Sequence, residues 1–250
     1  MEKTIEQLHI AAQYLAAIGI SFVAKQADDS HTNLGWDGIK ITTHSFGEGN
    51  FQVGFNLKSQ SLEWIKNGVI TNVIDLNESN HGAVLNWFSE QVNANNINEA
   101  FQYKFHYELP YEKIKVNDSF SFDSSEVLKY SQYLTTAQKA FETFLASNKL
   151  ESPIRIWPHH FDLGIYTKLS NNLFLGAGLA IPDSLVDDLY YYASGWLDGN
   201  AISTKAFSGL SNGNWRSSDW DGATLPSKNI NVNEVIDFLN QVKIRFLKNK

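Results

Sequence analysis

Short segments in which apolar and polar residues alternate constrain the fold of this chain more than any other feature. The clearest lies at 101–109, where every second residue is aromatic or aliphatic and the residues between them are polar or charged. Similar segments occur at 39–44 and 51–57. Because successive side chains of a strand point to opposite faces of a sheet, this period of two predicts antiparallel strands buried on one face. We therefore expect an antiparallel sheet in the first half of the chain.

Helical patterns stand on either side of these strand segments. Apolar residues recur at intervals of three and four at 5–15, 127–144 and 235–242, and a shorter helix is expected around 84–92. Thr4, Asp123 and Asn231 precede the three longer stripes, each followed three residues later by Gln or Glu, which is the spacing of a capping box. Gly19 is predicted to end the first helix.

The same order of elements occurs twice, as a helix, several strands and a closing helix. In the second half we expect strands at 154–166, 173–181 and 189–197, with a turn at Asn171-Asn172. We predict an α+β fold of two similar helix–antiparallel strands–helix halves, 1–118 and 119–250, that form one compact structural unit. We interpret the halves as an internal duplication with a pseudo-two-fold arrangement.

Charge and composition exclude several classes of protein. The formal net charge is −7, so binding of nucleic acid through a basic surface is not expected. The absence of cysteine excludes disulfide scaffolds, thiol nucleophiles and cysteine-bound metals. No segment approaches the ~20 apolar residues of a membrane span, and the N-terminus lacks the pattern of a signal peptide. We expect a soluble, cytoplasmic protein that does not bind membranes, of unknown oligomeric state.

The run Trp157-Pro158-His159-His160-Phe161-Asp162-Leu163 is the best candidate for a functional site. It places two of the seven histidines and a carboxylate in a segment that otherwise has the pattern of a buried strand. Titratable groups are costly there unless they are hydrogen-bonded, paired or bound to a ligand. In a straight strand His160 and Asp162 share one face, about 6–7 Å apart along the backbone. His159 joins them only if Pro158 bends or bulges the strand.

Three interpretations of this run remain open. Asp162 with His159 or His160 could form the acid–base pair of a hydrolase- or isomerase-like enzyme, with or without a metal. The leading hypothesis is a pocket for a small polar or aromatic ligand. Its predicted lining is Trp157, His159, His160, Asp162, Tyr190, Tyr192 and Trp196. In the third interpretation the polar groups are structural, and Trp215 and Trp220 offer an interface to another protein. No cofactor or metal can be named from the sequence.

Common catalytic motifs are absent from the sequence. There is no metalloprotease helix, nucleophile elbow, P-loop or dinucleotide-binding glycine motif. Gly176-Ala177-Gly178 lies inside a strand pattern, where small residues indicate the close approach of another layer.

Four short motifs carry a resemblance to a known family. They are Leu8-His9, Phe161-Asp162-Leu163, Tyr190-Tyr191-Tyr192-Ala193 and Gly222-Ala223-Thr224-Leu225-Pro226. With these motifs in this order, the chain resembles a bacterial family known only as a domain of unknown function. The chain departs from that pattern at Pro158, where an aromatic residue is expected, and at His160, where a small residue is expected. The resemblance implies a shared architecture and a pocket that contains His159 and Asp162, and it implies no reaction.

Overall fold

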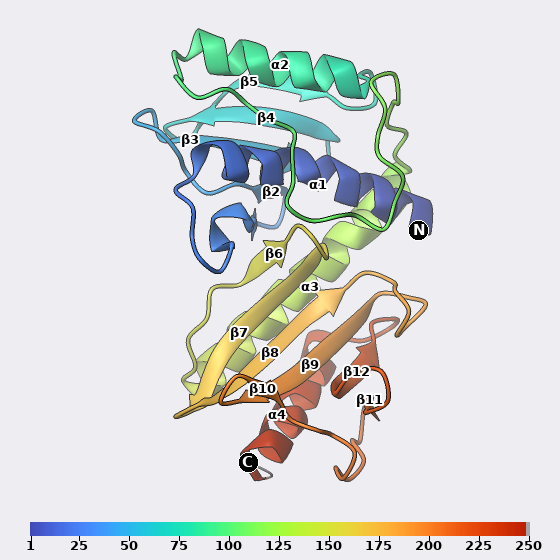
Figure 1. The fold of residues 1–250 in the computed structure, drawn as a ribbon. Coiled ribbons are helices and arrows are strands. Elements are labelled where there is room, and N and C mark those ends of the chain that lie inside the picture. Colours follow the sequence, from blue (N-terminus) through green and yellow to red (C-terminus); the bar gives the residue numbers. More distant parts are fainter. Residues whose placement is uncertain (249–250) are drawn as a thin grey trace. The chain divides into compact units, whose positions relative to one another are not determined.

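The computed structural model describes residues 1–248 and has an α+β fold with two antiparallel sheets (Figure 1), as the sequence predicts. The chain is grouped into two units. Unit 1 contains Met1–Gln132 and Ile156–Phe161, and unit 2 contains Tyr133–Arg155 and the chain from Asp162 onward. Among the described residues, no helix has both the length and the apolar character needed to cross a membrane.

Unit 1 consists of an antiparallel sheet of five strands, in the order β1-β2-β3-β4-β5, with two helices packed on it. Its elements are α1 (Glu2–Phe22), the 3-10 helix η1 (Ser30–Thr32), β1 (Gly35–Trp36), β2 (Lys40–Thr42), β3 (Phe51–Asn56), β4 (Ser61–Lys66), β5 (Val69–Asp75) and α2 (His81–Ala94). Helix α1 contacts β3, and Trp87 of α2 meets Trp64 of β4 with ring centroids 6.4 Å apart. Tyr14 and Phe88 join the two helices at 5.9 Å. The predicted strands at 39–44 and 51–57 are confirmed as β2 and β3.

The segment 101–109 is a loop, so the prediction of a strand there is wrong. Its residues alternate between half-buried and exposed, as the pattern requires. In the described part of the chain, however, no backbone hydrogen bond joins it to a strand, and the backbone N–H of Gln102 donates to Ser21 Oγ. The aromatic side chains pack on the helices instead, with Tyr103 5.1 Å from Tyr14 and Phe101 4.6 Å from Phe88. The alternation therefore results from packing against helices and not from pairing in a sheet.

Unit 2 contains the second antiparallel sheet, in the order β11-β12-β9-β8-β7, with β10 paired to β9. The elements in this part of the chain are α3 (Ser124–Asn148), β6 (Arg155–Trp157), β7 (Asp162–Ser170), β8 (Leu173–Ala180), β9 (Tyr190–Leu197), β10 (Asn200–Ala201), β11 (Asn214–Arg216), β12 (Gly222–Pro226) and α4 (Val232–Lys248). The boundary between the units falls inside α3 and inside β6. The strands expected at 173–181 and 189–197 are confirmed as β8 and β9.

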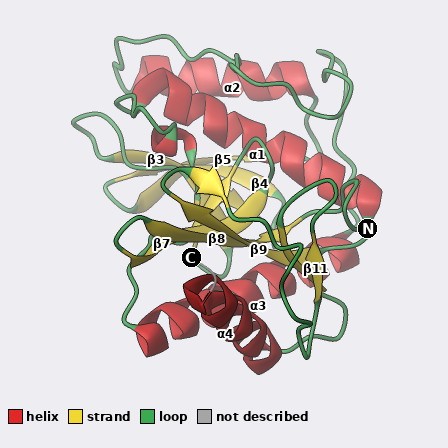
Figure 2. Ribbon diagram, turned by 60° about the horizontal axis from the view of Figure 1, so that its bottom comes forward, coloured by secondary structure: helices red, strands yellow, loops and turns green. Residues whose placement is uncertain are grey.

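Helix α4 and the C-terminal part of α3 lie on one side of the sheet in unit 2 (Figure 2). Phe141 of α3 contacts Tyr191 of β9 with ring centroids 6.4 Å apart. Phe246 of α4 lies over Gly195, where a Cβ atom would come within 2.5 Å of the phenyl ring. Tyr191 and Gly195 therefore face the helices, and the alternate residues of β9 point to the other side of the sheet.

The chain does not run straight from 154 to 166, so the prediction of one continuous strand is wrong. A turn separates β6 from β7, and the backbone N–H groups of His160 and Phe161 donate to the carbonyl of Trp157 at 3.2 and 2.7 Å. Phe161 has a φ of +55°, in the left-handed region. The bend at Pro158, which the sequence analysis allowed for, is the arrangement found.

Two of the three predicted helix caps are confirmed. Asp123 Oδ1 accepts from the backbone N–H of Glu126 at 3.1 Å. Asn231 Oδ1 accepts from the backbone N–H of Glu234 at 3.2 Å, and Glu234 Oε2 accepts in return from that of Asn231 at 2.9 Å. Thr4 is not a cap, because α1 begins at Glu2.

Gly19 does not end α1, which continues to Phe22. The glycine is needed for close packing, since a Cβ atom there would lie 2.8 Å from the carbonyl oxygen of His31.

The halves 1–118 and 119–250 and their internal duplication stay predictions. The two units are not consecutive halves of the chain, because unit 1 includes Ile156–Phe161.

Candidate functional site

The face of the sheet in unit 2 that points away from α4 carries a group of aromatic side chains. Directly paired residues of neighbouring strands share a face, and the register pairs Tyr166 with Gly176, Gly176 with Ser194, and Phe174 with Trp196. We call this group the platform, and it consists of Tyr166 from β7, Phe174 and Gly176 from β8, and Ser194 and Trp196 from β9.

The platform is open to solvent at Tyr166, half-buried at Phe174 and Trp196, and polar at its base. Tyr166 is 54% exposed and stacks with Phe174, with ring centroids 5.3 Å and planes 2° apart. Ser194 is only 5% exposed, and its Oγ accepts from the indole Nε1 of Trp196 at 3.2 Å. The arrangement offers flat apolar surfaces together with one fixed hydroxyl group.

Three glycines of β7 and β8 lie on this face, and packing explains two of them. A Cβ atom at Gly164 would lie 2.9 Å from the carbonyl oxygen of Ala177, and one at Gly178 would lie 2.6 Å from the ring of Tyr192. At Gly176 the nearest atoms would be 3.6 Å away, which is ordinary contact, and Gly176 has no positive φ. A strand glycine that packing does not require is typical of a place where a ligand approaches the backbone.

The other end of the same face is covered. Tyr192 donates its hydroxyl proton to Asp162 Oδ2 at 2.5 Å, and Asp162 is only 5% exposed. Trp220 packs edge-on against Tyr192, with ring centroids 6.2 Å apart. Burial, together with the charge of Asp162, raises the pKa of Tyr192 well above its ordinary value, so the proton stays on the phenol. Tyr190 similarly donates to Asp183 Oδ2 at 2.8 Å.

The two histidines of the candidate run lie on the turn in unit 1. The ring of His159 is 4.3 Å from that of His160 and 5.8 Å from that of Tyr107, between centroids. His160 is exposed, whereas His159 is half-buried. Burial lowers the pKa of His159 to about 4. His159 is therefore uncharged near pH 7 and is a weak base.

Helix α1 holds this turn through a buried histidine. His9 Nε2 lies 2.7 Å from the carbonyl oxygen of Pro158, which can only accept, and Gln13 Nε2 donates to the same oxygen at 2.8 Å. The imidazole stacks on Phe161, with centroids 5.0 Å and planes 5° apart. Burial lowers the pKa of His9 to about 4. These contacts make His9 a neutral structural group.

The predicted ligand-binding residues are divided between the two units. Four lie on one face of the sheet in unit 2: Asp162, Tyr190, Tyr192 and Trp196. Three belong to unit 1: Trp157, His159 and His160. Because the unit boundary falls between Phe161 and Asp162, the acid–base pair of a histidine with Asp162 stays a prediction. Tyr166, Phe174 and Ser194 were not among the residues predicted for the site. Gly176 was singled out in the sequence for close packing against another layer, but the nearest atoms to its Cβ position are 3.6 Å away and belong to side chains of the same sheet.

The alternative interpretations gain little from the geometry. Among residues 1–248, no three His, Asp or Glu side chains are grouped so that they could hold a metal ion. Trp215 and Trp220 are half-buried within unit 2. Trp215 packs against Phe207 and Phe246 at 4.9 and 5.8 Å, and Trp220 covers Tyr192 and Gly222.

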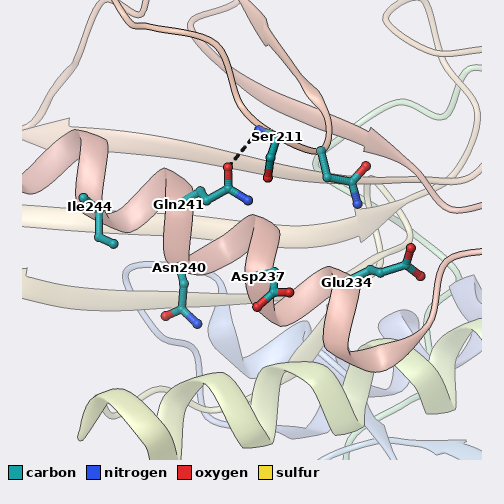
Figure 3. Close-up of a pocket in the computed structure, with 7 residues that line it drawn as sticks. Ser211, Glu234, Asp237, Asn240, Gln241 and Ile244 are labelled. Carbon is teal, nitrogen blue, oxygen red and sulfur yellow. Dashed lines mark hydrogen bonds between the residues drawn. The ribbon is translucent and has the colours of Figure 1, made fainter.

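A separate hollow of about 550 Å³ lies between α4 and the loop at 211–212 (Figure 3). It is lined by Ser211, Asn212, Glu234, Asp237, Asn240, Gln241 and Ile244. Glu234 already caps α4, and Gln241 Oε1 accepts from the backbone N–H of Ser211 at 2.9 Å. The hollow contains no aromatic side chain and none of the predicted site residues.

Fold and site together define an α+β protein with two antiparallel sheets, one of which carries an open aromatic platform. Residues 1–174 match the family of unknown function DUF5996, and the chain belongs to this family. No curated protein and no solved structure matches it. Of the four motifs behind the predicted resemblance, Leu8-His9 and Phe161-Asp162-Leu163 lie within the matched residues, and the other two lie beyond them.

Proposed function

We propose that the protein binds a small polar or aromatic ligand that has a flat apolar surface, and that the platform of unit 2 is the binding site. Gly176 carries this proposal, because it is half-buried in the middle of a strand and nothing in the packing requires a glycine there. An aromatic ring or the apolar face of a sugar ring lying over Gly176 would contact Tyr166 and Trp196 at its sides.

The exposure of Tyr166 supports the same site. A side chain as large as Tyr166 that is 54% exposed on a sheet gains burial when a ligand covers it. The hydroxyl groups of Tyr192 and Tyr190 already donate hydrogen bonds to Asp162 and Asp183. They therefore form the fixed, closed end of this face, and the open end at Gly176 is the part that receives the ligand.

The test is ligand-detected NMR by saturation transfer with three probes, benzoate, adenosine and methyl glucoside. We expect a transfer signal for at least one probe with the wild-type protein and its loss in Gly176→Val, whose methyl groups fill the space above β8. Gly209→Val is the matched control, since no atom lies within 4 Å of its Cβ position and Gly209 has no positive φ. No signal from any probe, or a signal unchanged in Gly176→Val, would overturn the proposal.

A further inference from the structure

The side chains around Gly176 limit the shape of a ligand that can lie over it. A Cβ atom at this position would lie 3.6 Å from Tyr166 Cδ2, 3.6 Å from Ser194 Oγ and 4.0 Å from Trp196 Nε1. Tyr166 of β7 and Trp196 of β9 thus both lie within 4.0 Å of this Cβ position. A flat ring fits such a space better than a puckered one, because it can lie over the backbone of Gly176 while its edges contact both aromatic side chains.

Ser194 indicates which hydrogen-bonding group the ligand needs. Its Oγ already accepts from the indole N–H of Trp196 at 3.2 Å, so the proton of its own hydroxyl group is what remains to be donated. A buried hydroxyl group is costly if its proton finds no acceptor. A ligand over Gly176 therefore needs a hydrogen-bond acceptor directed at Ser194.

The charge on this face indicates which charged group the ligand carries. Lys168 lies on the same face, directly opposite Phe174, and is a diagonal neighbour of Gly176. Such neighbours are about 7–8 Å apart, within reach of a long side chain. Lys168 is exposed and forms no ion pair within residues 1–248. Asp162 is the one carboxylate of β7, β8 and β9 on this face, and it is held by Tyr192 at the covered end.

We propose that the platform binds an aromatic carboxylate. The ring lies over Gly176 between Tyr166 and Trp196, and the carboxylate accepts the Ser194 proton and faces Lys168. This inference rests on the proposed function, because it names the class of ligand for the same site.

The test is isothermal titration with benzoate, cyclohexanecarboxylate and benzyl alcohol, which separate the planar ring from the charge. We expect benzoate to bind most tightly of the three. Lys168→Gln should weaken it about fivefold and Ser194→Ala about tenfold, the usual effects of an exposed ion pair and of a hydrogen bond to a charged group. Lys228→Gln is the matched control, since it removes an exposed lysine elsewhere in unit 2 and should leave the affinity unchanged.

Each result decides one of the two proposals. Equal binding of benzyl alcohol or cyclohexanecarboxylate, or benzoate binding that is insensitive to Lys168→Gln, overturns the aromatic carboxylate. Binding of methyl glucoside alone, lost in Gly176→Val, also overturns it and leaves the platform as a ligand site. If no probe binds the wild-type protein, both proposals fail.

Discussion

Glycines that look alike in the sequence have different roles in the folded chain. Gly176 and Gly178 stand on the same face of β8, two residues apart, yet a Cβ atom would be tolerated at the first and would strike the ring of Tyr192 at the second. Tyr192 cannot move away freely, because its hydroxyl group is bonded to the buried Asp162. Packing therefore explains the glycine at Gly178 and does not explain the one at Gly176.

The alanine variants of these glycines should therefore have opposite effects on stability. We expect Gly176→Ala to raise the free energy of unfolding by about 0.5–1 kcal/mol, since alanine loses less backbone entropy on folding than glycine. Gly178→Ala should lower it by about 1–3 kcal/mol through overpacking against Tyr192. Urea unfolding followed by circular dichroism measures both. Equal losses in the two variants would show that packing also requires Gly176.

Buried neutral histidines should make the protein sensitive to acid. His9 has a folded pKa of about 4, against about 6.5 when unfolded, so between these pH values the unfolded state binds the extra proton. Stability is full above pH 6.5 and falls as the pH drops towards 4, by up to about 3 kcal/mol from this group. In His9→Gln the free energy of unfolding should fall less steeply over this range. A wild-type slope in His9→Gln would contradict this prediction.

Strand pairing explains why the platform was only partly predictable. The alternation in β9 places Tyr190, Tyr192 and Trp196 on one face without any knowledge of their neighbours. The turn Asn171-Asn172 was also predictable, and continuing its register would place Tyr166 opposite Ala177. A register shift between Lys168 and Ser170 moves Tyr166 opposite Gly176 instead, which changes the residues it meets across the sheet. Nothing in the local pattern reveals that shift.

The turn and the loop were missed for a related reason. Alternation at 101–109 requires only that one side of the segment is buried, and helices can bury it as well as a paired strand can. At Pro158 the missing N–H group permitted a bend, but the sequence could not decide that the bend occurs. The carbonyl of Pro158 is fixed by His9 and Gln13, which lie about 150 residues earlier in the chain.

Hydrogen exchange should distinguish the loop at 101–109 from a true strand. Within the described residues its backbone amides have no partner in a ladder, so we expect protection factors of about 1, except at Gln102, whose N–H donates to Ser21 Oγ. The amides of β3, which pairs with strands on both sides, should be protected by several orders of magnitude. Protection of 101–109 at the level of β3 would instead support the strand that the sequence predicts.

The two units have separate aromatic cores although the chain passes between them three times. In unit 1, Phe88 contacts Tyr14 and Phe101, and in unit 2, Phe246 contacts Phe207 and Trp215. The boundaries lie within α3, within β6 and after Phe161, so no single cut separates the units. Continuous elements that belong to both units favour cooperative unfolding, whereas separate cores favour local opening of one unit at a time.

Core truncations can decide between these tendencies. Phe88→Ala and Phe246→Ala should each cost about 3–5 kcal/mol. If the units open separately, Phe88→Ala will lower amide protection in β3 and β4 and spare β8 and β9, and Phe246→Ala will do the reverse. Ile244→Ala, at a residue 43% exposed on the same helix as Phe246, should change neither set. We expect separate opening, because each phenylalanine packs against rings of its own unit, and an equal loss of protection in both sheets would instead establish one cooperative unit.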